Sequence, residues 1–231
     1  MKDICSLCSC QIRENSLFTT LTERQLNNFK DSISFFTYKK REVIYMEGDE
    51  CRGIYIIRKG RVKLVLSSST GKEQIIKILN PGDLIGFEVF CDMERFTNTA
   101  TVMDDAELCY ISRENFFNIL EKEPGIARKL IIAMGKELNH AYERIGSLGL
   151  LNAREKLAHL LYTLAEEYGV KKDGGISLNL KLSRLEIAEL LGITQETSIR
   201  LLKSFKEEGI LDIKRKEIII KAPDRLKLMG E

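Results

Sequence analysis

Cysteines are the residues of this chain best suited to redox or metal chemistry, and three of them lie close together near the N-terminus. Cys5, Cys8 and Cys10 form a C-x2-C-x-C pattern. Clustered thiols in a reducing compartment are typical of metal ligands or redox centres rather than of structural disulfides. The trio is therefore a candidate zinc site or the source of a regulatory disulfide. Cys109 lies in a strand-like run, where a buried core thiol is also common.

The expectation of a reducing compartment follows from the absence of targeting signals. Residues 1–13 contain cysteines and polar residues where a signal peptide needs an apolar run. No stretch approaches about 18 uninterrupted apolar residues, which a membrane-spanning helix would require. We therefore expect a cytoplasmic protein with no membrane partner.

A second set of chemistry-bearing residues lies at the start of a helix expected over residues 195–208. Glu196 and Arg200 are four residues apart, so they share one face of that helix. Arginine can bind O6 and N7 of guanine, and glutamate can accept a hydrogen bond from N4 of cytosine. Taken alone, the pair also fits a solvated ion pair on an ordinary helix.

The residues before this pair indicate a helix-turn-helix. Ser183 and Glu186 form a capping box at the start of a helix over residues 183–191. Gly192 ends that helix, because glycine tolerates the positive φ of a helix C-terminus. Thr194 is placed to cap the second helix, which carries Glu196 and Arg200.

A hairpin with a basic tip follows the second helix, over residues 209–220. Such a wing suits phosphate contacts, which position a protein on DNA without reading its sequence. The formal net charge of +2 is too small to indicate nucleic-acid binding by itself, so the DNA surface must be a local patch. The candidate DNA-binding residues are Ser183, Thr194, Gln195, Glu196, Thr197, Arg200, Lys203, Lys214, Arg215 and Lys216.

The N-terminal half has the pattern of short strands. Residues 54–57, 62–66 and 74–78 are β-branched runs separated by glycines and by the turn at residues 81–83. Short strands with turn signals about every ten residues are typical of a sandwich or roll. The chain has 231 residues and is 44% hydrophobic, which allows one large domain or two small ones.

A long helix is expected between these halves, over residues 124–151, because the hydrophobic period changes after Pro124. Apolar residues recur at alternating spacings of three and four, which is a heptad seam. The sequence predicts a helix that pairs with its own copy, and the alternative is a core helix packed inside one chain. The candidate interface residues are Ile131, Met134, Leu138, Ala141, Ile145 and Leu148.

Taken together, these patterns resemble the Crp/Fnr family, the catabolite activator and the fumarate–nitrate reduction regulators. The resemblance covers nearly the whole chain in the family's order, and no motif of an enzyme is present beside it. The matching segments are residues 47–49, 54–62, 81–86, 182–188, 191–194 and 196–200.

The resemblance implies an α+β fold with a cyclic-nucleotide-binding-like double-stranded β-roll, a dimerisation helix and a C-terminal winged helix-turn-helix. The expected parts are an N-terminal cysteine segment over residues 1–17, the β-roll sensor domain over 18–123, the dimerisation helix over 124–151 and the DNA-binding domain over 152–231. It also implies a homodimer that binds a two-fold, TGA-type operator and contacts RNA polymerase. Ile199 departs from the serine common before the reading arginine, which affects the outermost base preference; this isoleucine could meet a thymine methyl group or simply pack.

The resemblance leaves the signal open. Members that bind cyclic AMP have an adjacent Gly-Glu pair and an adjacent Arg-Ser or Arg-Thr pair. Here Phe87 separates Gly86 from Glu88, and Phe96 separates Arg95 from Thr97. These insertions argue against cyclic AMP as the effector.

The cysteine pattern favours the oxygen-sensing branch, in which three N-terminal cysteines and one at a position like Cys109 hold a [4Fe–4S] cluster. The resemblance thus implies Cys5, Cys8, Cys10 and Cys109 as ligands, although the C-x-C spacing is tighter than in the family. Zinc, thiol oxidation and another small ligand remain alternatives. So does a cyclic-nucleotide-type signalling module without DNA binding, which the Glu196/Arg200 helix and the basic wing argue against.

Overall fold

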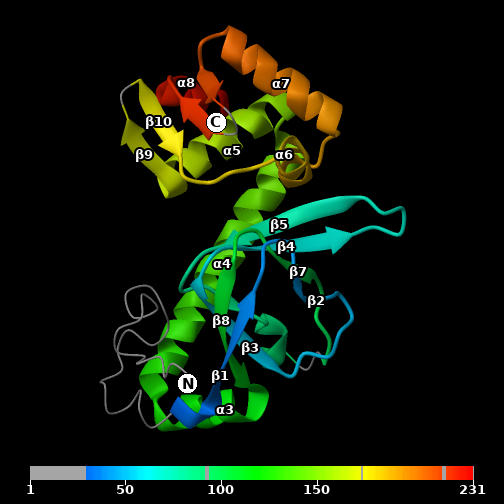
Figure 1. Cartoon of the computed structure of the whole chain (residues 1–231), viewed down its shortest axis with the longest axis vertical. Coiled ribbons are helices and arrows are strands. Elements are labelled where there is room, and N and C mark those ends of the chain that lie inside the picture. Colours follow the sequence, from blue (N-terminus) through cyan, green and yellow to red (C-terminus); the bar gives the residue numbers. More distant parts are fainter. Residues whose placement is uncertain (1–29, 92–93, 173, 215–216, 231) are drawn as a thin grey trace. The chain divides into compact units, whose positions relative to one another are not determined.

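The computed structural model describes residues 30–91, 94–172, 174–214 and 217–230. The chain divides into two compact units, one ending at Glu137 and one beginning at Leu138. Figure 1 shows a first unit made largely of strands and a second in which helices lie beside a small sheet. The mixed α and β content agrees with the fold class expected from the sequence.

Two four-stranded antiparallel sheets form the β-roll of the first unit. One sheet has the order β1 (Ile33–Tyr38), β8 (Ala106–Ser112), β3 (Gly53–Lys59) and β6 (Leu84–Ile85). The other has the order β2 (Val43–Tyr45), β7 (Thr99–Val102), β4 (Val62–Ser67) and β5 (Glu73–Leu79). A polar hairpin tip connects β4 and β5, and there the amide of Gly71 donates to the carbonyl of Ser68 at 2.9 Å.

Helices complete the core of this unit. The short 3-10 turns are η2 (Lys30–Ser32) and η3 (Phe87–Phe90), and the helices are α3 (Arg113–Lys122) and the start of α4 (Pro124–Leu150). Phe116 and Ile126 are fully buried in one apolar cluster with Ile54 and Leu108 of the sheet. Fully burying such side chains stabilises the fold by about 1.5–3 kcal/mol each.

Glycine is required at the tight connection between β3 and β4. Gly60 has φ of +82°, and a Cβ there would lie 2.6 Å from the carbonyl oxygen of Asp105. Any other residue would strain the backbone and press on the neighbouring strand. The backbone conformation and the close approach of Asp105 therefore explain why glycine occurs at position 60.

The second unit contains the end of α4 and a winged helix-turn-helix. Its helices are α5 (Ala153–Tyr168), α6 (Arg184–Leu191), α7 (Gln195–Glu207) and α8 (Pro223–Gly230). Its sheet has the order β11 (Leu211–Lys214), β12 (Glu217–Ile220), β10 (Gly175–Leu178) and β9 (Gly169–Lys172). Leu157, Phe205 and Ile210 are fully buried in its core.

One local expectation was wrong. The sequence around residues 171–175 reads as a loop, but Lys171 and Lys172 belong to strand β9, which pairs with β10. The strand is exposed along its whole length, so no alternation of apolar and polar residues marks it. Its lysines suit the open edge of a sheet, where charge discourages pairing with another chain.

No helix in the described part of the chain is long and apolar enough to cross a membrane. The longest helix, α4, has 27 residues but carries charged side chains along its length. Its period is that of a helix with one apolar face rather than of a membrane span.

Candidate DNA-recognition surface and sensor cysteines

The first helix of the motif begins and ends at the predicted residues. The backbone amide of Ser183 donates to Glu186 at 2.7 Å, and the amide of Glu186 donates to the Ser183 hydroxyl at 3.1 Å. This is the capping box expected from the sequence. Gly192 ends α6 with φ of 65°, so the chain turns sharply toward the second helix.

Helix α7 is fixed at its start by Thr194. The Thr194 hydroxyl accepts a hydrogen bond from the backbone amide of Thr197 at 3.3 Å. One face of the helix is buried through Ser198, Leu202 and Phe205. The packing of α7 therefore leaves the opposite face exposed to solvent.

The exposed face of α7 carries Glu196, Ile199, Arg200 and Lys203. Ile199 was a candidate for packing against the first helix, but 47% of its surface is exposed, and it directly precedes Arg200 in the sequence. Within the described residues neither Glu196 nor Arg200 has an ion-pair partner. The solvated Glu–Arg pair that the spacing also allowed is thus not formed.

The wing follows α7 as a hairpin of β11 and β12, in which Lys214 pairs with Glu217. Lys214 is exposed, whereas the other basic tip residues, Arg215 and Lys216, lie outside the described residues. Glu217 accepts hydrogen bonds from Lys172, at 2.6 Å, and from Ser177. These bonds lower the pKa of the Glu217 carboxyl, so it is ionised and paired next to the tip of the wing.

Sequence reasoning missed an arginine that supports α6. The guanidinium of Arg144, on α4, donates to the carbonyl of Leu190 at 2.8 Å. This contact satisfies a carbonyl in the last turn of α6 and places positive charge at the negative end of the helix dipole. Burial lowers the pKa of Arg144, although arginine remains charged in proteins.

Comparison with known proteins decides the family. Residues 35–123 match the cyclic nucleotide-binding domain and residues 155–229 match the Crp-like helix-turn-helix domain. The regulatory protein HlyX of Actinobacillus pleuropneumoniae is 32% identical over 219 residues, covering 94% of this chain and 91% of HlyX. The chain belongs to the Crp/Fnr family. It is a DNA-binding transcription regulator with a sensor domain and a helix-turn-helix domain.

Other Crp/Fnr proteins match over similar lengths. The fumarate and nitrate reduction regulatory protein of Salmonella typhimurium is 28% identical over 218 residues, covering 94% of this chain and 87% of that protein. The structure of FixK2 from Bradyrhizobium japonicum superposes with a TM-score of 0.77 at 28% identity, covering 86% of this chain and 98% of that chain. Both comparisons agree with the architecture described above.

The heptad face that the apolar spacing predicts for dimerisation is solvent-exposed on α4. Exposed fractions are 70% for Ile131, 52% for Leu138 and 66% for Ile145. Met134 and Ala141 are also exposed, and Leu148 is partly buried. A single copy of the chain thus leaves an apolar stripe along this helix exposed.

Of the four candidate cluster ligands, Cys109 is the one that the structure describes. It lies on β8 opposite Phe35 of β1 and Ile56 of β3, and 2% of its surface is exposed. Cys5, Cys8 and Cys10 lie outside the described residues. Among the residues described, no three His, Cys, Asp or Glu side chains come together as a metal site. Cysteine thiolates are the usual ligands of an iron–sulfur cluster, but the Cys109 side chain lies in the core of the β-roll.

The residues at the inserted Phe87 and Phe96 do not fit a cyclic-nucleotide phosphate. The buried Glu88 carboxylate accepts hydrogen bonds from the Thr97 amide at 3.2 Å, the Thr97 hydroxyl at 2.7 Å and the Asn98 amide at 3.1 Å. Donors that a phosphate would need are therefore bound to a carboxylate, which would also repel the phosphate. Phe96 is buried and stacks on Tyr45 with ring centroids 3.5 Å apart.

The same network affects two neighbouring groups. Tyr45 donates to Asn98 at 3.0 Å, and burial together with the Glu88 charge raises the pKa of its hydroxyl. Burial, followed by the Glu88 charge, raises the pKa of the Cys51 thiol to about 11. Cys51 is therefore an un-ionised core thiol at neutral pH and is poorly suited to redox chemistry.

Proposed function

We propose that this Crp/Fnr regulator is a homodimer that reads a two-fold operator with α7 and responds to a redox or oxygen-type signal in its sensor domain. The observation that carries the DNA part of the proposal is the exposed face of α7, on which Glu196 and Arg200 form no ion pair with any residue that the structure describes. Both side chains are available for base contacts without breaking an existing interaction.

Each residue of this face has a role that its chemistry supports. Arg200 donates to O6 and N7 of guanine, and Glu196 accepts from N4 of cytosine. Ile199 contacts a thymine methyl group, because its exposed side chain lies on the same part of the helix, three residues after Glu196 and directly before Arg200. This combination suits a TGA-type core in each half of the operator.

The remaining candidate residues position the protein on the DNA backbone through hydroxyl, amide and cationic donors. Lys203 extends the reading face by one turn and is exposed. The backbone-contacting set is Ser183, Thr194, Gln195, Thr197, Lys203, Lys214, Arg215 and Lys216.

Dimerisation is proposed through the exposed seam of α4, whose ends are Ile131 and Leu148. Burying exposed leucine and isoleucine side chains between two copies would stabilise the pair, and a parallel helix pair suits a two-fold operator. RNA polymerase is the proposed further partner. The proposed location of the protein is the cytoplasm.

The proposed sensor is an iron–sulfur cluster held by Cys5, Cys8, Cys10 and Cys109. The similar proteins named anaerobic regulatory protein and fumarate and nitrate reduction regulatory protein support a signal of this kind. Such a cluster supplies oxygen-sensitive redox chemistry. The chain's contribution is the set of four thiolates, one of which is on the β-roll.

A second candidate is regulation by thiol oxidation or a small effector without a cluster. The burial of Cys109 favours it, because a core thiol must move to reach a ligand outside the β-roll. Cys91 is exposed and offers a thiol outside the proposed ligand set.

Anaerobic purification followed by admission of air tests the redox proposal. We expect iron and sulfide, broad absorption near about 400 nm that bleaches in air, and an operator affinity that falls by roughly 5–150-fold. Cys109→Ser is expected to abolish the absorption, and Cys91→Ser is the matched control that retains it. An iron-free protein whose operator affinity ignores air would exclude the cluster. A response to thiol oxidants in that protein would establish the second candidate.

A further inference from the structure

The C-terminal end of α7, like its start, is fixed by hydrogen bonds of a capping motif. The amide of Ile210 donates to the carbonyl of Phe205 at 2.9 Å, and the amide of Gly209 donates to the carbonyl of Lys206 at 3.0 Å. With φ of +70° at Gly209, these bonds form a Schellman motif. The motif leaves the side chain and carbonyl of Glu208, the capping residue, available for contacts with other helices.

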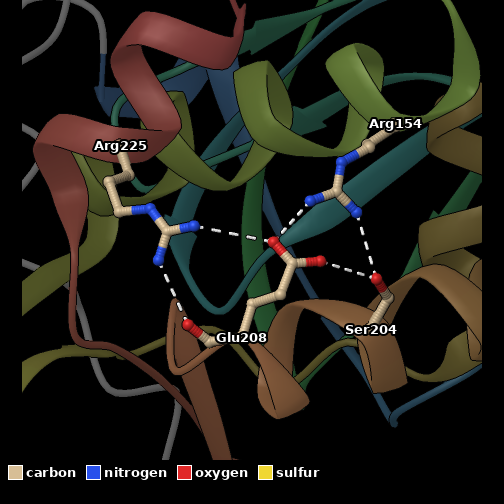
Figure 2. Close-up of polar contacts among 4 residues, drawn as sticks. All are labelled: Arg154, Ser204, Glu208 and Arg225. Atoms are coloured by element: carbon tan, nitrogen blue, oxygen red, sulfur yellow. Dashed lines mark hydrogen bonds and ion pairs between the residues drawn. The ribbon is translucent and has the colours of Figure 1, made fainter.

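Two arginines from different helices converge on Glu208 (Figure 2). Arg154, near the start of α5, donates to Glu208 Oε2 at 2.6 Å and to the Ser204 hydroxyl at 3.0 Å. Arg225, on α8, donates to the Glu208 carbonyl at 3.1 Å. Ser204 donates to Glu208 Oε1 at 2.8 Å, so both carboxylate oxygens and the carbonyl are engaged. We call Arg154, Ser204, Glu208 and Arg225 the Glu208 cluster.

An aromatic contact helps the ion pair to hold the Arg154 side chain in place. Its guanidinium lies 4.8 Å from the ring centroid of Phe205, a fully buried residue of α7. Such a cation–π contact adds to the hydrogen bonds with Ser204 and Glu208. Asn152 caps α5 with a capping box two residues before Arg154, so the backbone that carries the guanidinium is also fixed.

Helix α8 is likewise anchored before Arg225 reaches α7. Leu226, the next residue, is fully buried. A Cβ on Gly230 would lie 2.9 Å from the backbone of His159, so the end of α8 approaches α5 very closely. Arg225 therefore extends from a helix that is packed against the same helix that carries Arg154.

We propose that the Glu208 cluster sets the angle at which α7 presents its reading face, which makes Arg154, Glu208 and Arg225 positioning residues for DNA recognition. The inference rests on the proposed function of α7. Glu208 lies eight residues beyond Arg200, or about 12 Å along the helix axis. A rotation at this end displaces the base-reading side chains, whose hydrogen bonds tolerate errors of only about 0.5 Å.

Two simpler roles make different predictions. If Arg154 or Arg225 contacted a phosphate directly, its loss would reduce the salt dependence of binding by about one counterion. If the cluster only stabilised the fold, its loss would lower unfolding stability but leave the preference for operator over non-specific DNA unchanged. Exposed ion pairs commonly stabilise little, so this second role alone predicts small effects.

The test compares two neutralised glutamates on the same helix. Glu208→Gln removes the charge and one of the two side-chain acceptor oxygens that Arg154 and Ser204 bind, whereas Glu207→Gln removes the same charge from a residue whose partner is Lys203 within α7. We measure dissociation constants for an operator and for non-specific DNA over a range of salt, with urea unfolding of each protein. Glu208→Gln is expected to weaken operator binding about tenfold relative to Glu207→Gln, with unchanged non-specific binding and salt slope.

Arg225 provides an independent variant. Arg225→Ala is expected to weaken operator binding as Glu208→Gln does. Lys227→Ala removes the same charge from the same helix and is expected to leave operator binding unchanged. Arg225→Lys should restore part of the operator preference. The double variant Glu208→Gln with Arg225→Ala should lose less operator affinity than the sum of the two single losses, because Arg225 also lies 3.6 Å from the Glu208 carboxylate.

Equal operator preference in Glu208→Gln and Glu207→Gln would overturn the proposal, as would a shallower salt slope in Arg225→Ala. Arg200→Ala separates this failure from that of the proposed function. If Arg200→Ala loses base discrimination while Glu208→Gln keeps it, only the positioning role fails. If Arg200→Ala binds as the unmodified protein does, α7 is not the reader and both proposals fail.

Discussion

At the scale of single residues, the charged side chains that support the fold have hydrogen-bond partners within it, and those proposed to read DNA do not have such partners among the described residues. Glu208 and Glu217 both have lowered pKa values because they accept hydrogen bonds from neighbouring side chains. Glu196 and Arg200, in contrast, have no such partner within the described residues. A charged side chain that the fold does not use is available for a ligand, and here two of them lie one turn apart.

Ser198 is a residue whose removal should stabilise the protein. It is fully buried on α7, and its hydroxyl has no hydrogen-bond partner in the described part of the chain. Ser198→Ala removes the cost of burying that group and favours the helix, so the free energy of unfolding should rise by about 1 kcal/mol in urea denaturation.

Ser204→Ala is the matched control for this measurement. It makes the same chemical change on the same helix, but the Ser204 hydroxyl bonds to Arg154 and Glu208. This variant should lose stability. If Ser198→Ala destabilised the protein as much as Ser204→Ala does, the Ser198 hydroxyl would have a partner after all.

At the scale of elements, local signals predicted the pieces that capping and periodicity define. The capping box at Ser183, the turn at Gly192 and the Pro124 helix start could be predicted because each depends on a few adjacent residues. The β-roll strands followed from β-branched runs between turns. Strand β1 and helix α3 were not predicted, because partly exposed aromatic residues and a short helix give weak periodicity.

The Glu208 cluster was also missed, for a different reason. Its members come from three helices that are far apart in the sequence, so no spacing rule connects them. Helix α8 itself had a usable signal, since Pro223 and Asp224 suit the first turn of a helix. The pairing of Arg225 with Glu208 depends on the packing of α8 against α5, which the sequence alone does not show.

The exposed seam of α4 predicts the behaviour of a charged variant. Ile145→Glu would place two carboxylates opposite each other in the proposed dimer, in place of a buried apolar pair. We expect a monomer by light scattering and weaker binding to a two-fold operator. Ile132→Glu is the control: its side chain is 50% exposed on the same helix but is not part of the seam. A dimeric Ile145→Glu protein would exclude this interface.

At the scale of the whole molecule, the chain combines a β-roll unit with a winged helix-turn-helix unit, and α4 contributes residues to both. A Crp/Fnr regulator built this way presents one α7 per copy. Two copies on a two-fold operator would read half-sites about one helical turn of DNA apart. Specificity then arises twice, once at each α7, and each mismatched base pair should cost about 1–3 kcal/mol.

The most direct test of this account is equilibrium binding of the unmodified protein and Arg200→Ala to two operators. One operator carries a TGA-type core in each half, and the other has the guanine of each core replaced by adenine. The unmodified protein should prefer the first by about 1–3 kcal/mol per half-site, and Arg200→Ala should bind both equally. If Arg200→Ala kept the full preference for guanine, the assignment of α7 as the reading helix would be contradicted.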